Sequence, residues 1–152
     1  MAGKSSRASY LLTTQLLFFF DGLAEKPEMP PPGSAIAYRA GDILMSNIRP
    51  YLRKIWVADR SGGASNDVIV ARPGKKIVPT FLGHLLMSHR FISYIMDGAK
   101  GVKMPRGDLE QIQGFEVPLP SLPEQQKIAD GLTALDDLIR AQGERIEALR
   151  SH

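Results

Sequence analysis

A helix start followed by a heptad repeat dominates the C-terminal part of the chain. The segment SLPE at residues 121–124 matches a capping box, with Pro123 in the first turn, where proline is tolerated. Positions then recur at alternating spacings of four and three, apolar except for one glutamine: Ile128, Leu132, Leu135, Ile139, Gln142, Ile146 and Leu149. We call these positions the seam. They predict a helix over residues 123–150, about 40 Å long at about 1.5 Å per residue.

A stripe this narrow is typical of helices that pair with another helix. The other faces of the predicted helix are polar and mostly charged, for example at Lys127, Asp137 and Arg140. Gln142 weakens the seam, but a polar residue at such a position can fix the register of a coiled coil. The sequence therefore predicts a long coiled-coil helix that requires a helical partner.

Short strands are predicted in the middle of the chain, over residues 42–48, 54–58 and 67–71. The segment SGG at residues 61–63 is predicted to be a turn, and Pro73-Gly74 is predicted to end the third strand. Trp56, which lies within the second strand, and the nearby Tyr51 are predicted to be core residues rather than platforms for stacking nucleic-acid bases.

Helical spacing replaces the strand pattern over residues 80–96, with Thr80 as the expected N-cap and Gly98 as the stop. Asp108 is expected to cap a single helical turn. Residues 115–119 are predicted to form an edge strand, because Pro118 cannot donate a hydrogen bond to a neighbouring strand. The predicted fold class is α+β, a small mixed α/β domain followed by the long helix.

Three segments are predicted. Residues 1–35 form an atypical N-terminal segment with a Pro-rich linker, residues 36–120 form the domain, and residues 121–152 form the helix. The apolar run at residues 11–20 is too short to cross a bilayer, which takes roughly 20 apolar residues. It also lacks a signal-peptide cleavage site, so a buried strand or short helix is the favoured interpretation.

The bulk composition narrows the classes of function. The chain has no cysteine, which excludes disulfides and Cys-based zinc sites and fits a reducing cytoplasm. The net charge of +3 is compatible with nucleic-acid binding but also with many ordinary proteins. His84 and His89 are five residues apart, which misses the spacing of a helical zinc pair, and they are expected to be surface or satisfied core histidines. No nuclease, phosphate-loop or S-adenosylmethionine motif is evident, so no catalytic residue, metal or cofactor is predicted on this chain.

Two groups of cations are candidates for contact with DNA: Arg49, Arg53 and Lys54, and then Lys100, Lys103 and Arg106. Both groups lie on segments rich in proline or glycine, and such cations can hold phosphates or read guanine. Two alternatives remain. Arg49 and Arg53 instead brace the domain by bonds to carbonyl groups or to Asp42 and Asp67, and the second group is instead a solvated surface loop.

Several separated motifs resemble the specificity subunit of type I restriction-modification systems. They are GDIL at residues 41–44, SNIRPYLRK at 46–54, SNDVIV at 65–70, GVKMPR at 101–106 and PLPSLPEQQKI at 118–128. The resemblance covers roughly residues 35–150. It implies a target-recognition domain that reads one half of a split double-stranded DNA site and is joined to a helix that acts as a spacer.

The same resemblance implies the partners. A modification subunit would dock on the helix and methylate adenine with S-adenosylmethionine, and a restriction subunit would join it, so S-adenosylmethionine, Mg and ATP are expected on those subunits. The specificity subunit itself is not an enzyme. A full-length member has two recognition domains and two antiparallel helices, whereas this chain has one of each. Two hypotheses follow: a half-subunit that forms a homodimer through the seam and reads an interrupted palindrome, or a truncated fragment that acts only as a helix-mediated protein-interaction module. A third, more distant option is the recognition end of a fused methyltransferase-nuclease.

Overall fold

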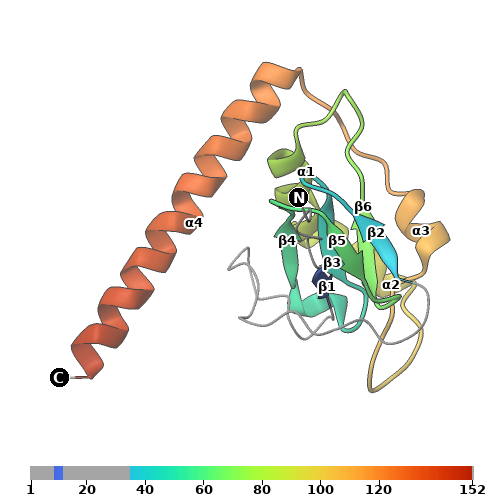
Figure 1. The fold of residues 1–152 in the computed structure, drawn as a ribbon, viewed down its shortest axis with the longest axis horizontal. Coiled ribbons are helices and arrows are strands. Elements are labelled where there is room, and N and C mark those ends of the chain that lie inside the picture. The colour runs from blue at the N-terminus through green and yellow to red at the C-terminus, as the bar shows by residue number, and fades with distance from the viewer. Residues whose placement is uncertain (1–8, 12–34, 152) are drawn as a thin grey trace, which may run out of the picture.

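The computed structural model describes residues 9–11 and 35–151, and Figure 1 shows their arrangement. One three-stranded sheet has the order β1-β5-β2, made of β1 (Ser9–Leu11), β5 (Gly62–Ala64) and β2 (Ile36–Tyr38). β5 pairs in parallel with β1 and antiparallel with β2. The turn predicted at residues 61–63 is therefore wrong. Pairing on both sides of β5 outweighs the low strand propensity of its two glycines. The strand or helix predicted for residues 11–20 lies outside the described residues, apart from Leu11 in β1.

The second sheet confirms the three predicted strands. Its order is β4-β3-β6, all antiparallel, with β3 (Ile43–Ser46) in the centre, β4 (Ile55–Val57) and β6 (Val68–Ala71). All four β3 residues are buried. Asp42, just before β3, is also buried, and Arg72 compensates its charge across an ion pair of 2.6 Å.

Side chains of alternate β3 residues separate two core clusters, as the two-residue period of a strand requires. Leu44 joins the first cluster with Tyr38, Trp56, Ala58, Ala64 and Val68. Ile43 and Met45 face the opposite way and join the second cluster, which contains Ile55, Leu86, Phe91, Ile92 and Ile95. The prediction that Trp56 is a core residue is confirmed. The same prediction for Tyr51 is wrong. Tyr51 lies in the 3-10 helix η1 (Pro50–Leu52) and is 46% exposed.

The single helix predicted over residues 80–96 is two helices, α1 (Pro79–Met87) and α2 (His89–Asp97). Ser88 between them has extended backbone, and its side chain accepts a hydrogen bond from the Phe91 amide at 3.2 Å. A serine in the middle of a helical pattern thus acts as an N-cap. Val78, not Thr80, is the N-cap of α1, while the predicted stop at Gly98 is confirmed.

After α2 the chain forms α3 (Leu109–Gln113), whose N-cap is Asp108, as predicted. The edge strand predicted over residues 115–119 is wrong, because these residues are not in a strand. A side-chain contact, not strand pairing, holds this segment against α2. The ring of Phe115 packs at 5.0 Å from the rings of both Phe91 and Tyr94.

α4 (Leu122–Arg150) confirms the long C-terminal helix and its capping box. The Ser121 amide donates to the Glu124 carboxylate at 2.9 Å. Its 29 residues correspond to about 43 Å of helix. In Figure 1, α4 extends away from the sheets, and its C-terminal end is well separated from the domain. None of the helices within the described ranges has the length and apolarity needed to span a membrane.

Candidate nucleic-acid interface and helical arm

The segment between α2 and α3 is a small hairpin, which we call the 100–107 hairpin. Lys100 and Arg106 face each other as an antiparallel bridge, with two backbone hydrogen bonds of 2.9 Å. Gly101 has a φ of 100°, and a Cβ there would lie 3.2 Å from the Met104 carbonyl oxygen. The tight turn therefore requires glycine at this position. In Figure 1 the hairpin projects from the end of the domain opposite the start of α4.

Asn47 joins this hairpin to the end of β3. Its side-chain oxygen accepts from the Gly107 amide at 3.0 Å, and its side-chain nitrogen donates to the Gly107 carbonyl at 3.3 Å. The Asn47 amide in turn donates to the Asp67 carbonyl at 2.8 Å, and the Arg49 amide donates to the Pro105 carbonyl at 2.9 Å. Three segments that are far apart in the sequence are therefore joined at one edge of the sheet.

Arg106 and Lys100, two of the six candidate cations, hold acidic residues of the same surface. Arg106 forms an ion pair of 2.9 Å with Asp67, and Lys100 forms one of 2.9 Å with Asp108. The hydrogen bond from Lys100 is the largest cause that lowers the pKa of the Asp108 carboxyl. Because both side chains remain exposed, they combine a bracing role with access to solvent.

The remaining cations differ in exposure. Arg49 and Lys103 are exposed, and within the described part of the chain neither side chain has an ion pair or hydrogen bond. Arg53 and Lys54 are half-buried, and Lys54 has an interaction partner. The alternative in which Arg49 and Arg53 brace the domain by bonds to carbonyl groups or to Asp42 and Asp67 is wrong for the described residues. Their side chains have no hydrogen bond or ion pair there, and the two carboxylates pair with Arg72 and Arg106.

Backbone geometry marks the turn that carries Arg49 and Arg53. These are the non-glycine residues with positive φ in the described ranges, at 52° and 50°, and they flank η1. Such a conformation costs on the order of 1 kcal/mol for a residue with a Cβ, so the surrounding contacts must hold it in place. The turn places the exposed Arg49 beside the 100–107 hairpin, to which its amide is bonded.

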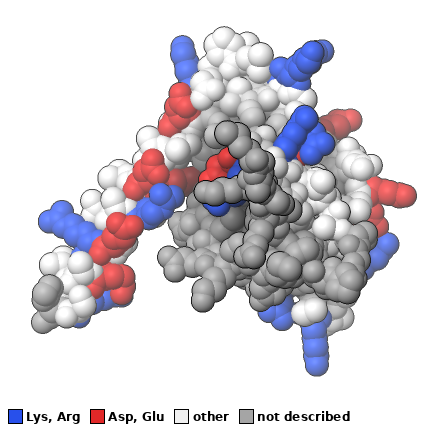
Figure 2. Space-filling view, viewed as in Figure 1, with Lys and Arg blue, Asp and Glu red and all other residues white. Residues whose placement is uncertain are grey.

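The tip of the hairpin is apolar. Val102 is fully exposed and Met104 is 49% exposed, on either side of Lys103. A shallow groove of about 570 Å³ adjoins the hairpin, lined by Asn47, Lys100, Arg106, Gly107, Asp108, Leu109 and Glu110. In Figure 2 a cationic side chain projects from the end of the domain that bears the hairpin. The arrangement presents apolar and cationic groups together on a braced support.

The start of α4 is fixed to the domain by Gln125, which the sequence analysis did not identify. Its side chain has no exposed surface. Its oxygen accepts from the Val78 amide at 2.9 Å, and its nitrogen donates to the carbonyls of Lys76 at 3.0 Å and Pro120 at 2.9 Å. One turn later Ala129 is also buried. Gln125 reads as an ordinary polar helix residue, so no sequence signal distinguishes it from its neighbour Gln126.

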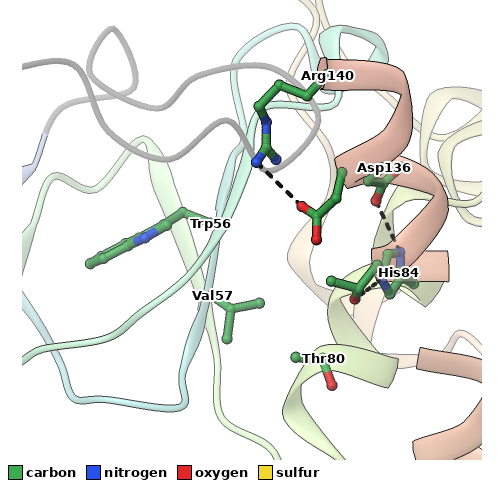
Figure 3. A pocket seen from close by; sticks show the side chains of 8 residues that line it. Trp56, Val57, Thr80, His84, Asp136 and Arg140 are labelled. Carbon is green, nitrogen blue, oxygen red and sulfur yellow. Dashed lines mark hydrogen bonds and ion pairs between the residues drawn. The ribbon is translucent and has the colours of Figure 1, made fainter. Parts of the chain in front are cut away.

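Further along α4, Thr133 and Asp136 face His84 on α1, as Figure 3 shows for His84 and Asp136. His84 is thus a largely buried histidine with partners, and His89 is an exposed one 3.3 Å from the Ser93 hydroxyl, which confirms the prediction of surface or satisfied core histidines. Burial is the first cause that lowers the pKa of His84, and the Asp136 carboxylate opposes it.

The seam lies to one side of this attachment. At about 100° per residue, its mean direction lies roughly 90° around the helix axis from the side bearing Gln125, Ala129 and Asp136. Every seam residue is exposed: Ile128, Leu132, Leu135, Ile139, Gln142, Ile146 and Leu149. Leu138, which the heptad pattern omits, is 55% exposed as well. Figure 2 shows cationic and anionic side chains interspersed along the same helix.

Comparison with known families covers the hairpin and the helical arm in a single match. The family model for the type I restriction modification DNA specificity domain matches residues 35–150. The chain belongs to this family. The match covers both the domain and α4, so this specificity domain includes its helix.

Two curated relatives agree. The specificity domain is 30% identical over 108 residues to the type I restriction enzyme EcoDI specificity subunit of Escherichia coli, covering 69% of this chain and 24% of the relative. It is 34% identical over 116 residues to the HindI specificity subunit of Haemophilus influenzae, covering 71% of this chain and 25% of the relative. The chain thus spans about a quarter of the length of these relatives. Both are specificity subunits, in agreement with the prediction of a non-catalytic chain.

Solved structures show the same fold. A chain from a study of the assembly and conformational transition of the type I R-M system matches with a TM-score of 0.77 and 25% identity, over 95% of this chain and 40% of that one. The HsdS subunit from Thermoanaerobacter tengcongensis matches with a TM-score of 0.77 and 23% identity, over 93% of this chain and 38% of that one. The predicted fold class, a small mixed domain followed by a long helix, is confirmed.

Proposed function

We propose that this specificity domain reads one half of a bipartite DNA site, and that α4 docks the modification and restriction subunits of a type I complex. The observation that carries the first part is the braced 100–107 hairpin. Its ends are bonded to each other and to Asn47 and Arg49 after β3, and it presents Lys103 and Val102 to solvent beside Arg49. A rigid support matters because base readout depends on placing side chains accurately in a groove.

The cations on this surface have two different roles, one structural and one in contact with DNA. Lys100 and Arg106 hold Asp108 and Asp67, so they mainly maintain the hairpin. Arg49 and Lys103 carry charge that carboxylates within the described residues do not compensate, which makes them the main candidates for phosphate or guanine contact. Val102 supplies an apolar contact to a base edge, such as a thymine methyl group.

The second part of the proposal rests on α4. An exposed apolar seam on a helix of about 43 Å is suited to another helix, and its length slightly exceeds one turn of DNA, roughly 34–36 Å. The chain spans 24% and 25% of its two curated relatives, and it contributes one recognition domain and one helix to the proposed complex. A second copy joined through the seam supplies a second domain and helix, and the complex then reads an interrupted palindrome. S-adenosylmethionine, Mg and ATP belong to the partner subunits.

A salt series tests the DNA part. The chain is purified together with the modification subunit, and its affinity is measured on random and methylatable duplexes at several salt concentrations. Arg49→Gln with Lys103→Ala should reduce the slope of log affinity against log salt by roughly 1–2, since each lost phosphate contact removes about 0.9. Lys75→Ala with Lys76→Gln is the matched control. Both lysines are exposed, and the pair removes the same charge from the turn before α1. An equal change of the salt slope in both double variants would show that the DNA does not contact the hairpin.

Val102→Ser separates base contact from charge, since it should weaken selective binding several-fold and leave the salt slope unchanged. Unaltered selectivity would exclude Val102 from the interface. A stable complex with the modification subunit that shows no selective DNA binding would support the alternative, a helix-mediated interaction module, for which the exposed seam is the favouring observation.

A further inference from the structure

α4 is attached to the domain at two places, and both involve α1 or the residue before it. Gln125 is the first, bonded to the amide of Val78, the N-cap of α1. The second is a polar contact on α1 itself. His84 Nε2 lies 3.2 Å from Thr133 Oγ1, and His84 Nδ1 lies 3.8 Å from Asp136 Oδ2. We call this second contact, made by His84, Thr133 and Asp136, the latch. Beyond Arg140 the remaining helical residues, 141–150, are exposed.

The latch is incompletely satisfied. Asp136 Oδ2 is buried and has no hydrogen-bond partner among the described residues. Leaving such an atom unpaired costs on the order of 1–3 kcal/mol, so the closed contact is held weakly. A cavity of about 280 Å³ lies between the two helices and β4, lined by Trp56, Val57, Thr80, His84, Thr133, Asp136, Asp137 and Arg140 (Figure 3). The cavity provides room for small movements of α4 against the domain.

The geometry of α4 makes the latch a short arm of a lever. With Gln125 as pivot, Asp136 lies about 16 Å along the helix and Arg150 about 38 Å along it. A shift of about 1 Å at Asp136 therefore moves the C-terminal end by about 2.3 Å. DNA rises about 3.4 Å per base pair, so a movement of about 1.5 Å at the latch corresponds to one base pair at the end of the arm.

We propose that the latch is a positioning device: His84, Thr133 and Asp136 set the direction of α4, and thereby the number of base pairs between half-sites that the assembled complex accepts. The part concerning direction stands on the geometry alone. The part concerning base pairs rests on the proposed function.

Pulsed electron paramagnetic resonance measures the direction directly. The chain has no cysteine, so Asp97→Cys and Ala148→Cys, both at exposed positions, place one spin label on the domain and one near the end of α4. Asp136→Lys should broaden or shift the distribution of the distance between the two labels by several ångström. A displacement of α4 by the longer side chain at the latch is multiplied about 2.3-fold at the end of the helix. Asp130→Lys is the matched control. It makes the same charge change at an exposed position whose described partner is Gln126 on the same helix.

Charge-swap rescue distinguishes positioning from loss of folding. Adding His84→Glu to Asp136→Lys places opposite charges at the latch and should restore the wild-type distribution. Thr133→Val, which removes only a hydroxyl, should broaden the distribution to a smaller extent and serves if Asp136→Lys does not fold. If Asp136→Lys and Thr133→Val both give the distribution of Asp130→Lys, the latch does not set the direction of α4.

The functional part is tested on duplexes whose half-sites are separated by one base pair more or fewer than the preferred spacing. With the modification subunit present, Asp136→Lys should reduce the discrimination between spacings by several-fold, while the salt slope stays unchanged. Equal discrimination in Asp136→Lys and Asp130→Lys would overturn this role even if wild type binds selectively. Absence of selective binding in wild type would instead refute the proposed function and leave the distance measurement as the test of the latch.

Discussion

Gln125→Leu is the most informative single change for the attachment of α4. The glutamine makes three hydrogen bonds, to Val78, Lys76 and Pro120, and has no exposed surface. Each bond contributes about 0.5–1.5 kcal/mol net, and an unpaired buried backbone group costs about 1–3 kcal/mol. Leucine recovers part of this through apolar burial, and water can reach the neighbourhood of the exposed Lys76. We expect a loss of about 2–4 kcal/mol in the free energy of unfolding.

Urea denaturation of the full chain measures this loss. Gln126→Leu is a matched control one residue away. Gln126 is exposed, its described side-chain bond is to Asp130 at 2.7 Å, and its replacement should cost no more than about 0.5 kcal/mol. Equal costs for the two variants would refute the reasoning, because burial and backbone bonding are all that distinguish the two glutamines.

Gln125→Glu adds a test of the hydrogen-bond direction. A carboxylate cannot donate to the carbonyls of Lys76 and Pro120, whereas a protonated carboxyl can donate to one of them. Burial beside carbonyl oxygens should raise the pKa of the new group in the folded state. Its contribution to stability is then present at low pH and lost as pH rises through that pKa. A variant whose stability shows no such fall relative to wild type would contradict the bonding described for Gln125.

Three further predictions concern packing, ionisation and assembly. Gly98→Ala should lower the free energy of unfolding by about 1–3 kcal/mol, because the new Cβ would lie 1.8 Å from Gln111 Oε1, and the side-chain amide of Gln111 is held by its 2.6 Å bond to the Tyr94 carbonyl. Gly143→Ala, where a Cβ meets open space, should be neutral or stabilising. Similar urea midpoints for the two variants would contradict this reasoning. The hydrogen bond from Arg72 lowers the pKa of Asp42, so wild type should lose stability as pH falls below the ordinary carboxyl value of 3.8. Arg72→Leu should lower the free energy of unfolding by about 1–3 kcal/mol at pH 7 and flatten that acid dependence. Parallel curves of stability against pH for wild type and the variant would argue against the ion pair. Leu135→Asp with Ile139→Asp should abolish co-elution with the modification subunit in size-exclusion chromatography. The stability of the isolated chain should change by less than about 1 kcal/mol, since both side chains are more than half exposed. Intact co-elution would show that the seam does not dock the modification subunit.

Local patterns predicted several elements well. The capping box and the seam were sufficient for α4, because helix starts and heptad spacing are local properties of the sequence. The strands β3, β4 and β6 were also predicted, because each is a short apolar run between turn residues. Where local signals were ambiguous, the predictions failed. Ser88 interrupted a helix pattern, and the glycines of β5 were taken for a turn although neighbours on both sides make them a strand.

The candidate site shows the same division between local and tertiary information. The amino-acid sequence alone was sufficient to predict that cations gather at residues 49–54 and 100–106, that no cysteine chemistry exists, and that a long helix bears an apolar seam. The folded structure determines which cations are compensated, because Asp67 and Asp108 reach Arg106 and Lys100 through folding. It likewise selected Gln125 and His84 as the attachment of α4, since pairing between residues far apart in the sequence depends on the packing of α1 against α4, and no local pattern encodes that packing.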